Sequence, residues 1–332
     1  MANPGACILG VEGHRLGPDE AAFLRESDPF GLILFARNID SPDQVRRLTG
    51  DLRAALGRDA PILIDQEGGR VQRMGPPNWR QWVPPLDEGA GLPDEKRARA
   101  IWLRYRLIAA ELAAVGIDAD CAPSGDIATA GTHPFLKNRC FGTGPATVIP
   151  AMRAAADGLL AGGVLPVMKH MPGHGRAQVD SHLTPPIVTE PLDLLDATDF
   201  ATFRALSDLP MGMTGHVVLT ALDPEHPATQ SPVVIAAIRE RIGYDGLLMT
   251  DDLGMQALAG TPYDRAGRAI AAGCDLALHC NGNRAELAQS VEAAGRLTPA
   301  GQARADRALA RRHPPEPVDL AALIAEFEGL TA

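Results

Sequence analysis

The segment GVLPVMKHMPGHGRAQVDSH, residues 163–182, joins a short apolar run to a cluster of polar side chains. The run ends at Met168, and the next fourteen residues contain a lysine, three histidines and an aspartate, together with one proline and two glycines. This order is typical of a buried strand that opens into a functional loop. We therefore expect a strand that ends at Met168 and an active-site loop that follows it.

Similar apolar runs recur along the chain, and helical patterns lie between them. Eight strands that alternate with helices predict an α/β fold, a single (β/α)8 barrel of the TIM type, with its active site at the C-terminal ends of the strands. A doubly wound open sheet is the competing fold, but no G-x-G-x-x-G pattern opens a helix after the first run. The eight expected strands are residues 7–11, 31–36, 61–64, 115–119, 164–168, 210–214, 246–250 and 274–279.

Several helices are marked by residues at their ends. Ser41 and Ser231 each stand before a proline at the first helical position, and Gly57 and Gly243 are the expected stops. We expect residues 1–300 to form the barrel and residues 301–332 to form a helical tail packed on its outside. Further helices are expected at residues 97–114, 146–161, 192–206, 263–272 and 284–296.

Polar residues directly follow the expected strands, which is where a barrel enzyme carries its chemistry. Because the C-terminal ends of all the strands meet at one end of the barrel, we expect these side chains to lie near each other. They are Asp65, Lys169, His170, His216 and Asp251.

The composition favours a small-molecule enzyme. The chain has 332 residues and a formal net charge of -10, and its 31 basic residues are scattered, so no basic stripe indicates nucleic acid or an anionic membrane as a partner. Five cysteines without a C-x-x-C pattern indicate reduced thiols. The first residues lack the basic region of a signal peptide, and no apolar stretch is long enough to span a bilayer. We expect a cytoplasmic monomer.

Asp180 and His182 are two residues apart, so in an extended segment both side chains leave the same face of the backbone. A carboxylate that accepts a hydrogen bond from one imidazole nitrogen makes the other nitrogen a better base, which suits general acid/base chemistry. A surface pair with no chemical role is the alternative. The spacing of His170, His174, Asp180 and His182 also allows a zinc site, although no HExxH or paired-cysteine pattern supports it.

Two further polar blocks follow expected strands. Asp251 and Asp252 are neighbours, so only one of them should face the pocket while the chain is extended, and periodicity does not show which. Such a pair of carboxylates could also bind Mg²⁺. In the block at residues 65–73, DQEGGRVQR, an aspartate can accept sugar hydroxyls and an arginine can donate to others. A structural ion pair within the block, from Asp65 or Glu67 to one of its arginines, is equally open.

Four motifs resemble those of the family 3 glycoside hydrolases, in the branch of the β-N-acetylglucosaminidases. Residues 169–182 are similar to the signature K-H-[FM]-P-G-H-G-x4-D-S-H, with Met171 where phenylalanine is commoner. Residues 65–73 match a second motif of the family, and residues 138–142 and 250–255 resemble its R-[SC]-F-G and [ST]-D-x-L-x-M elements. The resemblance covers about residues 7–283.

The resemblance implies a retaining exo-β-N-acetylglucosaminidase without metal or other cofactor. Its substrates would be terminal, non-reducing β-linked N-acetylglucosamine residues of cell-wall muropeptides or anhydro-disaccharides. By the same resemblance Asp251 is the nucleophile and His182, oriented by Asp180, is the acid/base. Asp252 is then structural. The residues carried over as sugar-binding groups are Asp65, Arg73, Arg139, Lys169 and His170, with the last two as donors.

Other roles are less fixed. We expect His174 to organise the loop through hydrogen bonds, and His216 is either a site residue or a satisfied buried histidine. A loop-borne acid/base also predicts that residues 171–185 close over the substrate. A β-glucosidase or β-xylosidase of the same family would usually take its acid from a second domain and lack the H-G-x4-D-S-H loop. A non-catalytic sugar-binding barrel would need a lost nucleophile or acid, and both are present.

Overall fold

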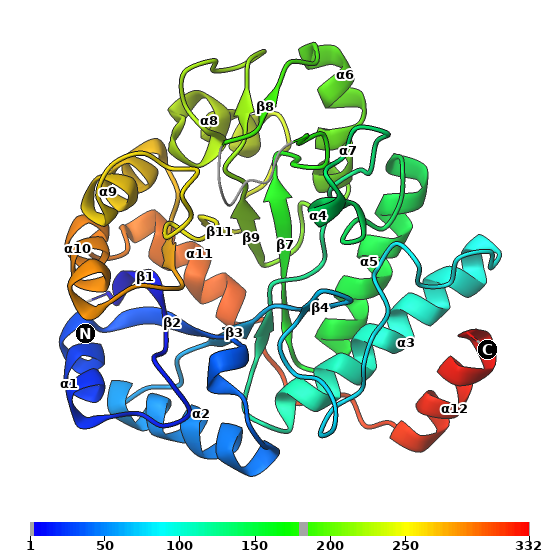
Figure 1. Cartoon of the computed structure of the whole chain (residues 1–332), viewed down its shortest axis with the longest axis horizontal. Helices are drawn as coiled ribbons and strands as arrows, with labels where there is room; N and C mark the ends of the chain where they lie inside the picture. The colour runs from blue at the N-terminus through cyan, green and yellow to red at the C-terminus, as the bar shows by residue number, and fades with distance from the viewer. Residues whose placement is uncertain (1–2, 179–184, 332) are drawn as a thin grey trace.

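The computed structural model describes residues 3–178 and 185–331. Eight parallel strands lie in the centre of the molecule and helices surround them (Figure 1). β12 pairs with β1, and a single bridge between Met249 and Leu276 links β11 to the segment that leads into β12, so the sheet closes as a barrel. The strands, in sheet order, are β11 (Leu247–Met249), β9 (Met211–Thr214), β7 (Leu165–Met171), β6 (Ala119–Asp120), β3 (Ile62–Ile64), β2 (Pro29–Leu34), β1 (Gly5–Gly10) and β12 (Ala277–His279).

The barrel confirms the expected fold class. Every residue of these eight strands is buried, which explains why they appear in the sequence as continuous apolar runs rather than alternating ones. The fourth run is the least accurate, because most of residues 115–119 form the turn after α3 and β6 begins only at Ala119.

The two marked helix starts are also confirmed. The Ser231 hydroxyl accepts a hydrogen bond from the backbone N–H of Val234 at 3.2 Å. At the other start, α2 begins at Pro42 and ends before Gly57, whose φ of 65° favours glycine. The helices around the barrel are α1 (Pro18–Ser27), α2 (Pro42–Leu56), α3 (Asp94–Ala113), α4 (Pro134–Lys137), α5 (Pro145–Ala161), α8 (Pro232–Glu240), α9 (Pro262–Ala272) and α10 (Arg284–Ala294), with short 3-10 turns η1 (Ala36–Asn38) and η2 (Ala228–Gln230).

The single helix expected at residues 192–206 is wrong. The segment forms two short helices, α6 (Leu192–Ala197) and α7 (Asp199–Arg204), which are separated at Thr198 with φ -120° and ψ -80°. The Thr198 hydroxyl accepts a hydrogen bond from Arg176 Nη2 at 3.0 Å. The break therefore lies where the active-site loop contacts this part of the barrel wall.

Two small sheets lie outside the barrel. β4 (Gln66–Gly68) and β5 (Val71–Gln72) form a hairpin directly after β3, and β8 (Ile187–Val188) pairs with β10 (Val218–Leu219). Gly68 has a φ of 99°, and a Cβ at this position would lie 1.9 Å from Arg104 Nη2. The hairpin can therefore pack on α3 only with glycine here.

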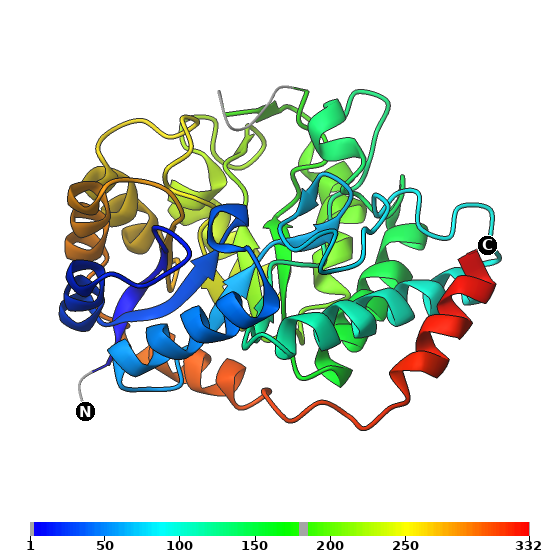
Figure 2. The same cartoon turned by 60° about the horizontal axis from the view of Figure 1, so that its bottom comes forward.

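The last part of the chain runs under the barrel as α11 (Pro299–Leu309) and then ends in α12 (Leu320–Thr331), which lies beside α3 (Figure 2). Phe327 packs edge-on against Trp82 with ring centroids 5.5 Å apart, and Glu326 pairs with Arg99. The division of the chain at residue 300 stays a prediction. Among the described residues, none of the helices has both the length and the apolar character needed to cross a membrane.

Candidate active site

A pocket of about 260 Å³ opens at the C-terminal ends of the barrel strands. One part of its wall is polar and contains the five expected sugar-binding residues and Asp251, so the structure brings these six together. Apolar side chains complete the lining, among them Ile33, Phe35, Met213 and Leu278. A larger cavity of about 470 Å³ lies between the segment around residue 88 and α12, away from the strand ends. The polar wall is formed by Asp65, Arg73, Arg139, Lys169, His170, His174, Asp251 and Asp252.

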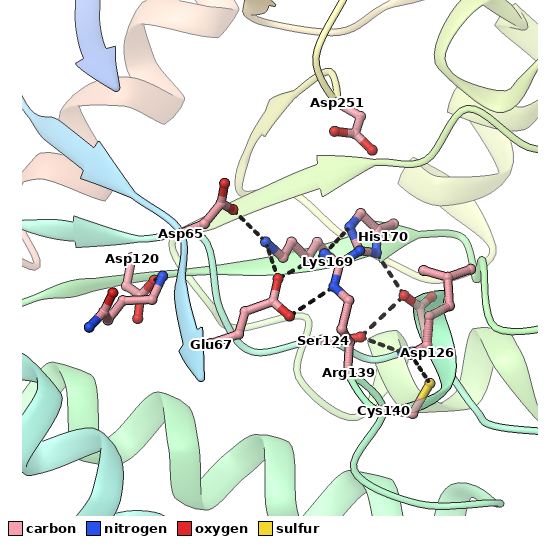
Figure 3. A network of polar contacts seen from close by, with 12 residues as sticks. Asp65, Glu67, Asp120, Ser124, Asp126, Arg139, Cys140, Lys169, His170 and Asp251 are labelled. Atoms are coloured by element: carbon pink, nitrogen blue, oxygen red, sulfur yellow. Dashed lines mark hydrogen bonds and ion pairs between the residues drawn. The ribbon is translucent and has the colours of Figure 1, made fainter. Parts of the chain in front are cut away.

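Three cations of this wall alternate with two carboxylates, Asp65 and the buried Glu67 behind the wall, in the order Arg73, Asp65, Lys169, Glu67, Arg139. Figure 3 shows the part of this series from Asp65 to Arg139. Asp65 accepts hydrogen bonds from Lys169 Nζ at 2.7 Å and from Arg73 Nη2 at 2.9 Å. Glu67 accepts from Lys169 Nζ at 2.6 Å and, with both oxygens, from Nε and Nη2 of Arg139 at 2.9 and 2.8 Å. The cations are therefore held by bidentate or shared carboxylates, which are the strong kind of charged contact.

These contacts keep both carboxylates ionised. Burial alone would raise the pKa of Asp65, but Lys169 and Arg73 hold it well below its ordinary value. Burial also opposes ionisation of Glu67, but Arg139 and Lys169 lower its pKa to about 2. The open alternative of an ion pair within residues 65–73 is correct for Asp65 and Arg73, whereas Glu67 pairs outside the block.

His170 lies between a carboxylate and a guanidinium. Asp126 Oδ2 lies 2.7 Å from Nδ1 of the ring, and Arg139 Nη2 lies 3.2 Å from Nε2. Asp126 is fully surrounded by protein, and its second oxygen accepts the backbone N–H of His174 at 2.7 Å. Burial would raise the pKa of Asp126, but its contacts with the two histidines hold it well below its usual range.

The two aspartates after β11 have different surroundings. Asp251 lines the pocket, and its Oδ1 accepts the backbone N–H of Asp252 at 2.8 Å. Burial raises the pKa of Asp251, but the polar rings of His170 and His216 and the backbone N–H of Asp252 together outweigh it, so the pKa is lowered and the carboxylate is ionised. Asp252 Oδ1 instead accepts two backbone N–H groups, from Gly254 and Cys280, both at 2.9 Å. Asp252 therefore holds the loop after β11 to the loop after β12.

The first part of the expected active-site loop is fixed by packing. Residues 171–175 and Ala177 are buried, and Arg176 Nε donates to Asp199 at 2.7 Å. A Cβ on Gly175 would lie 2.1 Å from the carbonyl oxygen of Ile127, so only glycine allows this close approach. These contacts hold residues 171–177 against the barrel in this structure, and the expected closure of residues 171–185 over the substrate stays a prediction. The expected acid/base pair, Asp180 and His182, lies outside the described residues.

His174 and His216 have opposite surroundings. The backbone N–H of His174 is bonded as expected, but within residues 3–178 and 185–331 neither of its ring nitrogens has a hydrogen-bond partner, and burial lowers the pKa of the ring to about 3. Its ring packs edge-on against His170. His216 contacts the Thr229 hydroxyl through Nδ1 at 2.8 Å and the Asp252 carbonyl through Nε2 at 3.0 Å. It is thus the satisfied buried histidine.

The described part of the chain does not support the zinc and Mg²⁺ alternatives. Within it, no group of three or more His, Cys, Asp or Glu side chains is arranged to hold a metal ion. Asp180 and His182 of the zinc alternative lie outside it. In the Mg²⁺ alternative, one oxygen of Asp252 is already used by two backbone N–H groups.

Two residues of this site were not singled out from the sequence as functional. The sequence offers Glu67 only as a partner for the nearby arginines, and it gives no role to Asp126, which lies in the segment after the fourth run. Their charged and imidazole partners are 44 to 102 positions away in the chain, too far for local spacing to indicate them. The only signal for Asp126 is its position after a strand end.

A (β/α)8 barrel with a pocket of ion-paired carboxylates and cations at its strand ends places the protein in the class of barrel enzymes. Residues 10–311 match the sequence model of the protein family described as "Glycosyl hydrolase family 3 N terminal domain". The chain is 38% identical over 287 residues to a protein named beta-hexosaminidase from Alkalilimnicola ehrlichii, which covers 83% of this chain and 81% of that one. The chain therefore belongs to glycosyl hydrolase family 3 and is a glycoside hydrolase.

Solved structures show the same similarity over the whole fold. Native NagZ from Neisseria gonorrhoeae is 30% identical with a TM-score of 0.86, over 100% of this chain and 99% of that one. A family 3 beta-N-acetylglucosaminidase from Paenibacillus sp. is 30% identical with a TM-score of 0.82, over 98% of this chain but 62% of that chain.

Proposed function

We propose that this protein is a retaining β-N-acetylhexosaminidase that forms a covalent glycosyl-enzyme on Asp251. The observation that carries the proposal is the place of Asp251, an ionised carboxylate in the wall of a pocket whose other polar groups suit sugar hydroxyls. An attacking carboxylate must be ionised and within reach of the anomeric carbon. The similarity to proteins named beta-hexosaminidase supports N-acetylhexosamine as the sugar.

The polar wall has free hydrogen-bonding capacity for a sugar. Among the described residues, Lys169 uses two of its three N–H bonds, on Asp65 and Glu67, which leaves one for a hydroxyl. Within the same part of the chain, each oxygen of Asp65 accepts one bond from a side chain and can accept another. These groups lie with Arg73, Arg139 and His170 in a pocket slightly smaller than the roughly 300–1,000 Å³ of common small-ligand sites. One terminal sugar fits such a pocket better than the interior of a chain, in keeping with exo action.

We assign the acid/base role to His182, oriented by Asp180. The assignment rests on the D-S-H motif and on the described start of the same loop, where His174 lines the pocket. In the first step His182 would protonate the glycosidic oxygen while Asp251 attacks. In the second it would deprotonate the water that releases the sugar from Asp251. This division leaves Asp251 free to act only as nucleophile.

The natural substrates would be cell-wall muropeptides or anhydro-disaccharides with a terminal β-linked N-acetylglucosamine, and the protein would act as a cytoplasmic monomer. One observation supports a reducing compartment: the five cysteines all lie in the described part of the chain, and none of them forms a disulfide.

Substitution at Asp251 tests the nucleophile. With an aryl β-N-acetylglucosaminide, Asp251→Ala should show no turnover above background, whereas Asp19→Ala, an exposed aspartate in the first turn of α1, should match the wild type. Substantial activity of Asp251→Ala would reject the assignment. The aryl β-glucoside, assayed in parallel, distinguishes a β-glucosidase, which would turn it over at least as fast.

The acid role has its own test. His182→Ala should lower kcat/KM by roughly 10²–10⁴ with a poor leaving group and by less with a good one, because a good leaving group needs little protonation. An equal loss with both leaving groups would contradict the assignment.

A further inference from the structure

His170 is bonded on its two sides by groups of opposite hydrogen-bonding character (Figure 3). An ionised aspartate such as Asp126 only accepts hydrogen bonds, so the proton of this contact belongs to His170 Nδ1. A guanidinium only donates, so Nε2 of the ring must offer its lone pair to Arg139. A neutral imidazole with its proton on Nδ1 satisfies both contacts. The other tautomer and the imidazolium would each turn an N–H toward Arg139.

Asp126 is itself fixed in orientation. Its Oδ1 accepts the backbone N–H of His174 at 2.7 Å, and its Oδ2 accepts both His170 Nδ1–H and the Ser124 hydroxyl, the latter at 3.1 Å. The side chain is 1% exposed. No water competes for these oxygens, and the carboxylate therefore links the ring of His170 to the backbone of the active-site loop.

Arg139 is held on two edges as a result. Glu67 accepts from its Nε and Nη2, and His170 Nε2 accepts from its Nη2. Within the described ranges its Nη1 has no acceptor, and Arg139 is part of the pocket wall. The Nη1 edge is thus the part of the guanidinium that can donate to a ligand in the pocket.

We propose that Asp126 is a positioning residue that sets the tautomer of His170 and, through it, directs the Nη1 edge of Arg139 at the bound sugar. His170 then serves as a hydrogen-bond acceptor in the site, not as the donor that the family resemblance implies. The inference rests on the proposed function only for the identity of the ligand. The tautomer itself is a property of the free protein.

Asp126→Asn separates this role from simple packing. The amide has the shape of the carboxylate but only one acceptor oxygen, and two neighbouring N–H groups need an acceptor. If the oxygen stays on the His174 N–H, the NH₂ faces His170 Nδ1 and moves the ring proton to Nε2, toward Arg139. If the amide is reversed, its NH₂ faces the His174 N–H instead. In either arrangement two N–H donors face each other with no acceptor between them.

The direct readout is the ¹⁵N spectrum of histidine-labelled protein in the absence of ligand, with the His170 signals identified by their loss in His170→Gln. The wild type should show a protonated Nδ1 and an unprotonated Nε2 at neutral pH. Asp126→Asn should move the proton to Nε2, or leave the ring exchanging between tautomers if both amide orientations are populated. Ser124→Ala is the matched control, because it removes another hydrogen bond to the same oxygen and should leave the tautomer unchanged.

Kinetics and binding complete the test. Asp126→Asn should raise KM, and the dissociation constant for N-acetylglucosamine, about 10- to 100-fold with a smaller change in kcat, since one charged hydrogen bond to the sugar is lost. Ser124→Ala should change them by less than about fivefold. A wild-type ring with its proton on Nε2, or an Asp126→Asn protein that keeps both the tautomer and the affinity, would overturn the inference.

The wild-type spectrum decides the tautomer even if Asp126→Asn fails to fold. A wild type that binds N-acetylglucosamine and has the expected tautomer but hydrolyses no hexosaminide would support this inference while rejecting the proposed function.

Discussion

Replacing Glu67 by glutamine should destabilise the protein far more than its small change of shape suggests. Glu67 is 1% exposed and accepts three charged hydrogen bonds from Arg139 and Lys169. Glutamine has one acceptor oxygen, so at least one donor of a buried cation then faces the amide NH₂. Breaking a buried pair by removing one partner typically costs about 3–5 kcal/mol. The lowered pKa of Glu67, about 2 against an ordinary 4.5, corresponds independently to about 3 kcal/mol at pH 7.

The measurement is the melting temperature of wild type and Glu67→Gln across pH. A loss of this size should lower the melting temperature by roughly 5–10 °C at pH 7. A carboxylate whose pKa is lowered by folding stabilises the folded state at pH values above the pKa that the group has in the unfolded chain. This stabilisation is lost as the pH falls through the lower pKa of the folded state. The gap between the two proteins should therefore narrow from about pH 5 downward, toward pH 2.

Glu326→Gln is the matched control. Glu326 also accepts two bonds from one arginine, Arg99, at 2.7 and 2.8 Å, but both side chains are more than 40% exposed. Such a surface pair contributes about 0–1 kcal/mol. If Glu67→Gln costs no more than Glu326→Gln, or if its cost does not change with pH, the electrostatic explanation of the polar wall is wrong.

Two further changes test other parts of the structure. Burial raises the pKa of Asp120 to about 7 and leaves its Oδ2 without a partner among the described residues. The protonated carboxyl therefore stabilises the folded wild type below about pH 4, and this stabilisation is lost as the pH rises to 7. The melting temperature of Asp120→Asn relative to that of the wild type should be higher at pH 8 than at pH 4.5, and a constant difference would contradict this explanation. Gly175→Ala should sharply lower the yield of folded protein, because its Cβ would overlap the Ile127 carbonyl oxygen. Gly144→Ala is the control and should fold normally, because no atom lies within 4 Å of its added Cβ. Equal yields of the two variants would show that the loop start is not fixed as described.

The barrel could be predicted from the sequence because its signals are local. Strands buried on both faces give continuous apolar runs, and the Ser-Pro starts place α2 and α8 correctly. The break at Thr198 could not be predicted, since it occurs where Arg176, 22 positions earlier, bonds to the threonine hydroxyl. The start of β6 was missed because a two-residue strand leaves almost no periodicity.

The site was predictable in part for the same reason. Residues that follow an apolar run, such as Lys169 and Asp251, are indicated by that run, and the family motifs supply their roles. The expected end of the strand at Met168 is too early, because β7 continues to Met171. Glu67 and Asp126 act through partners brought near by the closure of the barrel, and no local pattern records those contacts. Periodicity could not choose between Asp251 and Asp252. The family motif selects Asp251, and the structure adds that one oxygen of Asp252 is occupied by two backbone N–H groups.

The most direct test of the account is to trap the glycosyl-enzyme. Incubation with a fluorinated N-acetylglucosaminyl donor that transfers quickly and hydrolyses slowly, followed by proteolysis and mass spectrometry, should place one sugar on the peptide that contains residues 250–255, attached to Asp251. A label on any other residue, or rapid turnover with no labelled peptide at any time, would contradict Asp251 as the nucleophile.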